Sequence, residues 1–156
     1  QNHEWKDDFS RLVKELAEAP CSGKLARLDF FNCWRLGGDV RCFSVLTRLQ
    51  SLNLGFTQVN GDVKGLASLV SLRNLDLRLT KVSGNVMALG TLVRLEKLNL
   101  NATKVSGDVM AFAPLVNLKE VHVWKTNVTG IVALRRQLPG LRLDCNDRQS
   151  CACTIT

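Results

Sequence analysis

The 156-residue sequence predicts an α/β solenoid, in which short repeated units stack and share a parallel β-sheet. The first observation is repetition, since residues 75–86 read LDLRLTKVSGNV and residues 98–109 read LNLNATKVSGDV. Two further copies, at 52–63 and 121–132, keep the same spacing of 23 residues. The second observation is that each copy opens with leucine or valine residues two positions apart, which is the period of one strand face. Four copies at a fixed spacing indicate a repeat protein.

One repeat can be interpreted from residue 75 onward. Leu75 and Leu77 are expected on the inner face of a short strand, and Thr80 and Val82 are expected to turn inward after it. Gly84 then permits the backbone to bend. The return path is lined by apolar residues: Val86, Leu89 and Leu92. One such unit cannot bury its apolar side alone, so the stacked copies are expected to form one continuous core.

This pattern resembles the leucine-rich-repeat family, whose consensus is L-x-x-L-x-L-x-x-N/C-x-L. The resemblance covers residues 25–144, about five repeats, and includes a degenerate copy at 28–40 with one extra residue before Leu36. It implies a horseshoe with a short parallel β-sheet on its concave face, a surface that this family commonly uses to bind proteins. The repeats are similar to plant-type repeats and to those of photosynthetic microalgal proteins, although the proline of the plant type is absent.

The position that normally holds Asn in this consensus carries Thr in four copies and Cys in the degenerate one: Thr57, Thr80, Thr103, Thr126 and Cys33. An Asn side chain can form hydrogen bonds with the backbone of the turn, and a Thr hydroxyl can form some of the same bonds. Thr80 and Thr103 are therefore expected to be buried and hydrogen-bonded to the turn.

The chain is expected to be one domain, 1–156, with sealed ends, because terminal repeats expose an apolar cross-section. Residues 1–24 are expected to form an N-terminal capping helix that ends at Pro20. Its apolar residues recur at helical spacing: Trp5, Phe9, Leu12, Val13 and Leu16. The alternative, a helix that binds a partner or a membrane, is disfavoured by the acidic residues between them. Residues 145–156 are expected to form a cysteine-rich C-terminal cap or tail.

The net charge of +7, from 21 basic and 14 acidic residues, is compatible with an acidic partner. The basic residues are scattered and no nucleic-acid-binding motif is present, so no nucleic acid partner is expected. No apolar run approaches the length of a membrane span. The chain opens on Gln1 without a signal-like segment, and we therefore expect a trimmed chain whose targeting segment is missing.

Catalytic motifs are missing from the sequence. There are two histidines, His3 and His122, and no tyrosine. There is no Gly-rich phosphate loop, no H-E-x-x-H and no G-x-S-x-G, and the carboxylates are dispersed. We expect a non-enzymatic protein without a cofactor.

The six cysteines form two groups of three near the two ends: Cys21, Cys33 and Cys42, then Cys145, Cys151 and Cys153. About four strand spacings of roughly 4.8 Å separate the groups, whereas bridged Cα atoms lie within about 7 Å, so no disulfide can join them. Cys33 stands where the family pattern allows Cys, which implies a buried, unpaired thiol. That leaves Cys21 to pair with Cys42.

At the C-terminal end, Cys145 is expected to pair with Cys151 or with Cys153, since a bond between the latter two alone would close a small, strained ring. The alternative is a zinc site made of these three cysteines and a carboxylate such as Asp147. Its spacing matches no standard zinc motif, so no metal is predicted.

The cysteine placement predicts an oxidising compartment outside the cytoplasm: secreted, extracellular or in an organelle lumen, the thylakoid lumen included. Two glycosylation sequons, Asn101-Ala-Thr103 and Asn127-Val-Thr129, are compatible with the secretory route. A glycan on Asn101 would obstruct the concave sheet face. Asn127 is therefore the expected site if either sequon is used.

A partner is expected to contact the concave face, through side chains that alternate with the buried strand leucines. The candidate partner-binding residues are Asn53, Phe56, Asp76, Arg78, Asn99, His122, Trp124 and Lys125. Trp124 and Phe56 carry most weight, because exposed aromatic residues are enriched at interface hot spots. The alternatives are an ordinary solvated sheet face and a Trp124 that is covered by the C-terminal tail.

The predicted function is a non-enzymatic protein-binding or recognition module. The first alternative is a small structural or accessory subunit of a larger organelle membrane complex such as a photosystem, which the microalgal resemblance implies. The second alternative is ice binding, prompted by the regular Thr-x-Val pairs. It is the weakest, because the family geometry turns Thr80 and Val82 into the solenoid.

Overall fold

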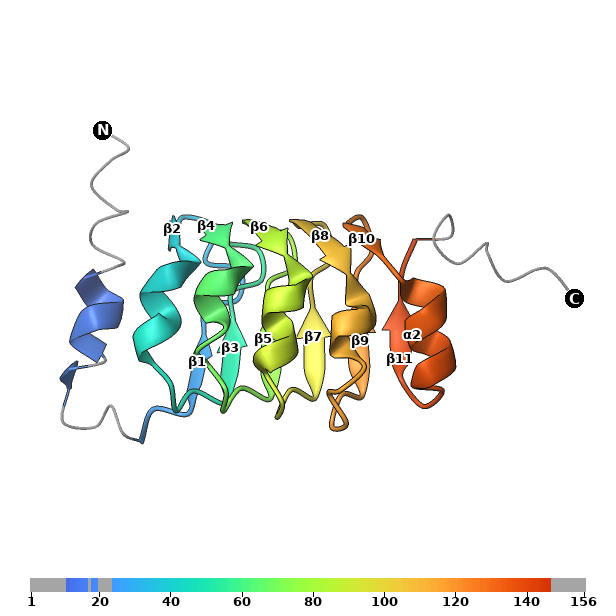
Figure 1. Ribbon diagram of the computed structural model, residues 1–156. Coiled ribbons are helices and arrows are strands. Elements are labelled where there is room, and N and C mark those ends of the chain that lie inside the picture. The colour runs from blue at the N-terminus through green and yellow to red at the C-terminus, as the bar shows by residue number, and fades with distance from the viewer. Residues whose placement is uncertain (1–10, 17, 20–23, 147–156) are drawn as a thin grey trace, which may run out of the picture.

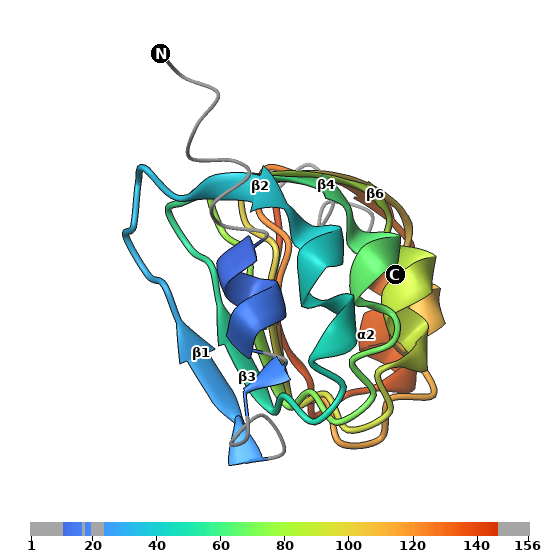
Figure 2. The ribbon, with the colours of Figure 1, turned by 90° about the vertical axis from the view of Figure 1, so that its left-hand side faces the viewer.

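Each repeat contributes two short parallel strands and a turn of helix, so that the chain winds as a solenoid (Figure 1). The computed structural model describes residues 11–16, 18–19 and 24–146 of the chain. Viewed from the N-terminal end, the first sheet, the second sheet and the helices form three sides of the solenoid (Figure 2).

The first sheet has six parallel strands in the order β1-β3-β5-β7-β9-β11. Its strands are β1 (Arg27–Asp29), β3 (Ser51–Asn53), β5 (Asn74–Asp76), β7 (Lys97–Asn99), β9 (Glu120–His122) and β11 (Arg142–Asp144). Leu52, Leu75, Leu98 and Val121 stand side by side in its register and are almost fully buried. The predicted 23-residue period is therefore the strand register, and burial of each such leucine contributes about 1.5–3 kcal/mol.

The second sheet has five parallel strands in the order β10-β8-β6-β4-β2. Its strands are β2 (Gly37–Asp39), β4 (Gln58–Asp62), β6 (Lys81–Asn85), β8 (Lys104–Asp108) and β10 (Asn127–Thr129). The sequence prediction of inward-turning Thr80 and Val82 is confirmed, because both are buried. The prediction did not include a second sheet, although Lys81 and Ser83 alternate outward with them at the strand period.

Helical turns complete each repeat on the side opposite the first sheet. They are the 3-10 helices η2 (Val40–Val45), η3 (Val63–Leu66), η4 (Val86–Thr91) and η5 (Val109–Phe112), followed by the α-helix α2 (Ile131–Gln137). Each 3-10 helix begins after an Asp or Asn whose side chain accepts a backbone hydrogen bond, as Asp62 does from Lys64 at 2.8 Å. This N-cap repeats at residues 39, 85 and 108 and fixes the start of every 3-10 helix.

The threonine ladder lies inside the turns, as predicted. The four residues, Thr57, Thr80, Thr103 and Thr126, are between 1% and 6% exposed. Each Oγ1 donates to the carbonyl three residues earlier, as Thr103 does to Leu100 at 2.7 Å. The hydroxyl therefore supplies a hydrogen-bond donor to a buried turn carbonyl.

Thr103→Val should lower the free energy of unfolding by about 1–3 kcal/mol, because it removes a buried hydrogen bond while keeping the shape of the side chain. Chemical denaturation of the variant and the wild type measures the difference. The exposed Thr47→Val is the matched control and should change stability by no more than about 0.5 kcal/mol. An unchanged midpoint for Thr103→Val would mean that the hydroxyl row does not support the fold.

The N-terminal segment is helical where it is described, at residues 11–16 and 18. Val13 is fully buried in the core, whereas Leu12, which was expected on the same face, is 44% exposed. The two are adjacent, and a helix points adjacent side chains about 100° apart. Residues 1–10, 17 and 20–23 lie outside the described part, so the capping role of 1–24 stays a prediction.

The expectation that Cys33 is buried is wrong, because Cys33 is exposed. The first repeat has seven residues between its two strands, 30–36, where the others have four, and the longer turn carries Cys33 and Trp34 outward. Cys42 is half-buried, and burial raises the pKa of its thiol to about 12. Neither Cys33 nor Cys42 forms a disulfide with a described residue. Cys21, Cys151 and Cys153 lie outside the described residues, so both predicted disulfides stay predictions.

Within the described ranges, no helix is both long and apolar enough to span a lipid bilayer. The same part of the chain contains no cluster of three or more His, Cys, Asp or Glu side chains that could hold a metal ion.

Candidate functional site

The first sheet carries a groove of about 350 Å³ on its outward face. Five of the eight predicted partner-binding residues line it: Asn53, Asp76, Arg78, Asn99 and His122. The strand residues among them point outward because they alternate with the buried leucines of the sheet. The strand period alone therefore brings together side chains that lie 23 residues apart in the sequence.

The Asn and Asp residues of this row also hold the turns that end the strands. Oδ1 of Asn53 accepts from the backbone N–H of Gly55 at 3.1 Å, and Oδ1 of Asp76 accepts from Arg78 at 3.0 Å. Asn99 repeats the arrangement at 3.1 Å. Because these turns occupy an acceptor oxygen, the amide N–H groups of Asn53 and Asn99 are the groups most available to a partner.

Arg78 lies at the end of the groove where the strands finish. Its Nη2 is 2.9 Å from Oδ2 of Asp76, and burial raises the pKa of Asp76 although the Arg78 contacts act in the opposite direction. The guanidinium carbon is 5.1 Å from the ring centroid of Phe31 and 6.0 Å from that of Phe56. The buried Nε has no hydrogen-bond partner among the described residues, so one donor of this arginine is unused.

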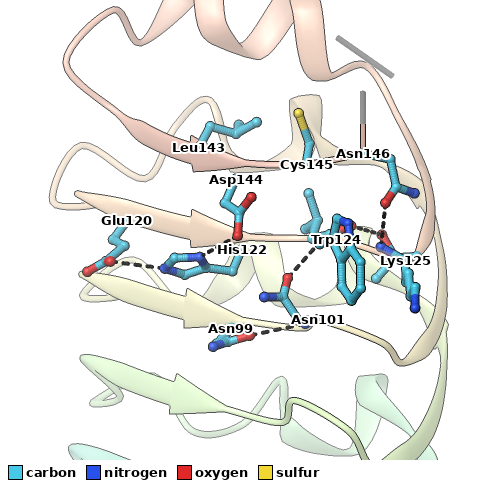
Figure 3. Close-up of polar contacts among 12 residues, drawn as sticks. Asn99, Asn101, Glu120, His122, Trp124, Lys125, Leu143, Asp144, Cys145 and Asn146 are labelled. Carbon is cyan, nitrogen blue, oxygen red and sulfur yellow. Dashed lines mark hydrogen bonds and ion pairs between the residues drawn. The ribbon is translucent and has the colours of Figure 1, made fainter. Parts of the chain in front are cut away.

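A mixed-charge cluster closes the C-terminal end of the groove. Nε2 of His122 is 2.9 Å from a carboxylate oxygen of Glu120, and its Nδ1 is 3.2 Å from a carboxylate oxygen of Asp144 on β11 (Figure 3). Nζ of Lys97 is 3.2 Å from the other oxygen of Glu120. The hydrogen bond from His122, together with Lys97, lowers the pKa of Glu120. The cluster therefore offers both signs of charge to a partner.

His122 also interrupts the row of side-chain turns, because it stands where the earlier repeats carry Asn or Asp. The backbone N–H of Trp124 donates instead to Oδ1 of Asn101, one repeat earlier, at 2.7 Å. The backbone N–H of Lys125 donates to Oδ1 of Asn146 at 2.8 Å. Nζ of Lys125 lies 4.2 Å from the ring centroid of Trp124, and Trp124 is 43% exposed (Figure 3).

The expectation that Phe56, Trp124 and Lys125 belong to the face of the sheet needs correction. The strands end earlier, at Asn53 and at His122, so these three residues lie in the segments that join the first sheet to the second. We call these segments the corner connectors: residues 30–36, 54–57, 77–80, 100–103 and 123–126. Phe56, Trp124 and Lys125 do not line the groove.

Several contact residues are not among the eight predicted partner-binding residues. They are Phe31, Lys97, Asn101, Glu120, Asp144 and Asn146. Lys97 and Glu120 share one outward row, which is a signal that the sequence contains. Asn101 contacts Trp124 because His122 leaves that turn without its side-chain acceptor. This contact could not be predicted from the sequence alone.

The two sequons differ in their surroundings. Asn127 is exposed at the start of β10 on the second sheet, away from the groove. Asn101 is partly buried and its side chain supports Trp124. Use of Asn127 stays a prediction, and its exposure is compatible with it.

No protein-family model matches the chain, and no curated protein matches it significantly. Among solved structures, the chain is similar to the leucine-rich-repeat ectodomain of the receptor kinase SOBIR1 from Arabidopsis thaliana. The TM-score is 0.64 at 27% identity, and the match covers 77% of this chain and 68% of that one. The ectodomain of the receptor kinase GASSHO1/SCHENGEN3 from the same plant, in complex with CASPARIAN STRIP INTEGRITY FACTOR 2, matches with a TM-score of 0.68 at 24% identity. That match covers 78% of this chain and 15% of the ectodomain.

A plant ice-binding protein is also similar, with a TM-score of 0.60 at 27% identity over 71% of this chain and 38% of that protein. The chain therefore spans a small part of some of its structural neighbours and about two-thirds of another. These neighbours agree with what the chain itself shows: the sequence repeat, the in-register strand leucines and the two parallel sheets. The chain has the leucine-rich-repeat fold.

Proposed function

We propose that the chain is a non-enzymatic protein-binding module that receives its partner on the outward face of the first sheet. The observation that carries the proposal is the groove on this face, with Asn amide donors, Arg78, His122 and the charged cluster around Glu120. Such a surface can specify a partner by hydrogen bonds and paired charges.

The neighbours support a binding role. They are described as receptor ectodomains, and one of them was solved in complex with another molecule, CASPARIAN STRIP INTEGRITY FACTOR 2. By the same comparison, we propose that the module works outside the cytoplasm, on the secretory route or in an organelle lumen. An acidic partner fits the net charge of +7.

Ice binding is the less favoured function, although one neighbour is an ice-binding protein. The Thr-x-Val pairs are buried, so they cannot form an outward array. The outward positions on the second sheet include Lys81 and Lys104, whose charged ammonium groups hold liquid water strongly. The charges on this surface therefore argue against an ice-binding role.

Capture of partners from the source organism tests the proposal. Asn74 is exposed and lines the groove, whereas Ser106 is exposed on the second sheet. Asn74→Arg should reduce recovery of the partner at least tenfold, while the matched Ser106→Arg should leave it unchanged. Equal recovery by both variants would contradict binding on the first sheet. Stoichiometric co-migration with a large membrane complex would favour the structural-subunit alternative.

Trp124→Ala should weaken binding of the captured partner by about 2 kcal/mol or more, which is roughly a 30-fold rise in Kd, because a half-exposed Trp offers a large area at low entropy cost. Unfolding should change little. Lys125→Glu should mainly slow association with an acidic partner, and less so at high salt. Loss of folding with intact binding of the folded fraction would make Trp124 a structural residue.

A further inference from the structure

We propose that the corner between the two sheets, in the N-terminal half of the solenoid, docks onto an anionic lipid surface. This role is separate from the proposed binding of a protein in the groove. It rests on four apolar side chains, which we call the corner patch: Phe31, Trp34, Phe56 and Leu79. Their exposed fractions are 45%, 61%, 40% and 50%. Neighbouring apolar side chains with this much exposure mark an interaction surface.

The corner patch extends over three successive connectors. The rings of Phe31 and Phe56 meet edge to face with centroids 5.4 Å apart. Phe56 and Leu79 hold the same position in successive connectors, which are joined by a 2.9 Å bond from the N–H of Phe56 to the carbonyl of Arg78. A Cβ at Gly55 would lie 3.2 Å from both Phe31 and Arg78, so the glycine makes room for these two side chains to meet.

Two residues of the corner patch occupy a backbone conformation that disfavours them. Phe56 has a φ of 60° and Leu79 a φ of 53°, in the left-handed region. Asn32 has a φ of 61° in the first connector, and Asn tolerates this conformation well. Phe56 and Leu79 are bulky and apolar, so this backbone conformation reduces stability at both positions. Because neither side chain is buried in return, they point to a role outside folding.

The charge of the corner suits anionic headgroups. The five corner connectors contain no Asp or Glu, although the chain has 14. The cation of Arg35 lies 4.6 Å from the ring centroid of Trp34, and Arg78 lies over Phe31. Lys81 and Lys104 come directly after the connectors at the starts of their strands, and neither they nor Arg35 form an ion pair with a described residue. Arg78 is already paired with Asp76, so the charges left for headgroups are those of Arg35, Lys81 and Lys104. Aromatic rings beside such cations match the boundary between acyl chains and phosphates.

The shape of the corner favours a lipid surface over a protein segment. The connectors succeed one another along one edge of the solenoid, between the first sheet and the second (Figure 2). Most of their backbone N–H groups are already used, as in the bond from Leu79 to the carbonyl of Asn101 at 2.9 Å. None of the corner patch lines the groove. The corner therefore offers apolar area and charge, with few backbone groups for a peptide to pair with.

Sedimentation of the full chain with lipid vesicles tests the proposal. The chain should bind vesicles of equimolar phosphatidylglycerol and phosphatidylcholine, and should not bind phosphatidylcholine alone. The double variant Phe56→Asn with Leu79→Asn should reduce binding at least tenfold without loss of folding, because Asn suits the left-handed backbone. Replacing Lys81 by Gln should reduce binding about fivefold, as each cation near an anionic surface contributes about that factor.

Matched variants exclude a general effect of charge or surface polarity. Val93→Asn with Val116→Asn changes two valines, 55% and 84% exposed, that lie outside the corner connectors, and should bind as the wild type does. Asn74→Arg in the groove should also retain vesicle binding. The proposal is overturned if anionic vesicles do not bind the wild type. Equal losses of vesicle binding in the corner variant and the valine variant would also overturn it. So would a corner variant that loses binding of a protein partner when the wild type does not bind vesicles.

Discussion

Gly84→Ala is expected to lower the free energy of unfolding by about 2–5 kcal/mol, through two effects that act together. Gly84 has a φ of 102°, a conformation that an alanine adopts only with strain. In addition, a Cβ at this position would collide with Oδ1 of Asp62. That oxygen accepts the hydrogen bond from Lys64 that begins η3, so the collision also disturbs the N-cap. A single methyl group therefore damages two neighbouring repeats.

Gly37→Ala is the matched control, since Gly37 also lies in the second sheet. Its φ is not in the left-handed region, and an added Cβ would lie at an ordinary 3.7 Å from Gln58. We expect a change of no more than about 0.5 kcal/mol. Denaturant unfolding of both variants gives the comparison. Similar losses for the two glycines would show that neither the backbone conformation nor the Asp62 contact determines the requirement for glycine.

The predictable part of the fold is the part that local periodicity determines. Leucines two apart, repeated every 23 residues, leave one way to stack the strands, and Leu52, Leu75 and Leu98 do stand in one register. The second sheet is harder to predict, because Thr80 and Val82 give only the inward half of its alternation and Lys81 gives the outward half. Cys33 departs from its expected place because the turn between β1 and β2 is longer than the turns of the later repeats.

The candidate site also has a part that could be predicted from the sequence and a part that could not. Asn53, Asp76 and Asn99 could be placed by alternation, and they do line the groove. Phe56 and Trp124 could not, because each strand ends after three residues and the chain then enters a corner connector. The sequence contains the turn-forming residues, but the length of a strand depends on the packing of neighbouring repeats. Contacts between repeats are therefore the least predictable part of the site.

Phe112→Ala is expected to lower the free energy of unfolding by about 3–5 kcal/mol, because it opens a cavity in a close-packed core. Phe112 is fully buried in η5, at the position that Leu66 and Leu89 hold in the two preceding repeats. Phe112→Leu restores the side chain of those repeats and should cost only about 1 kcal/mol. Val116→Ala, at a side chain that is 84% exposed, should be nearly neutral. In a solenoid whose repeats share their stability, Phe112→Ala should shift a single unfolding transition by roughly 2–4 °C per kcal/mol. Two separate transitions in calorimetry would contradict this expectation, because they would mean that the repeats around η5 unfold independently of those before it.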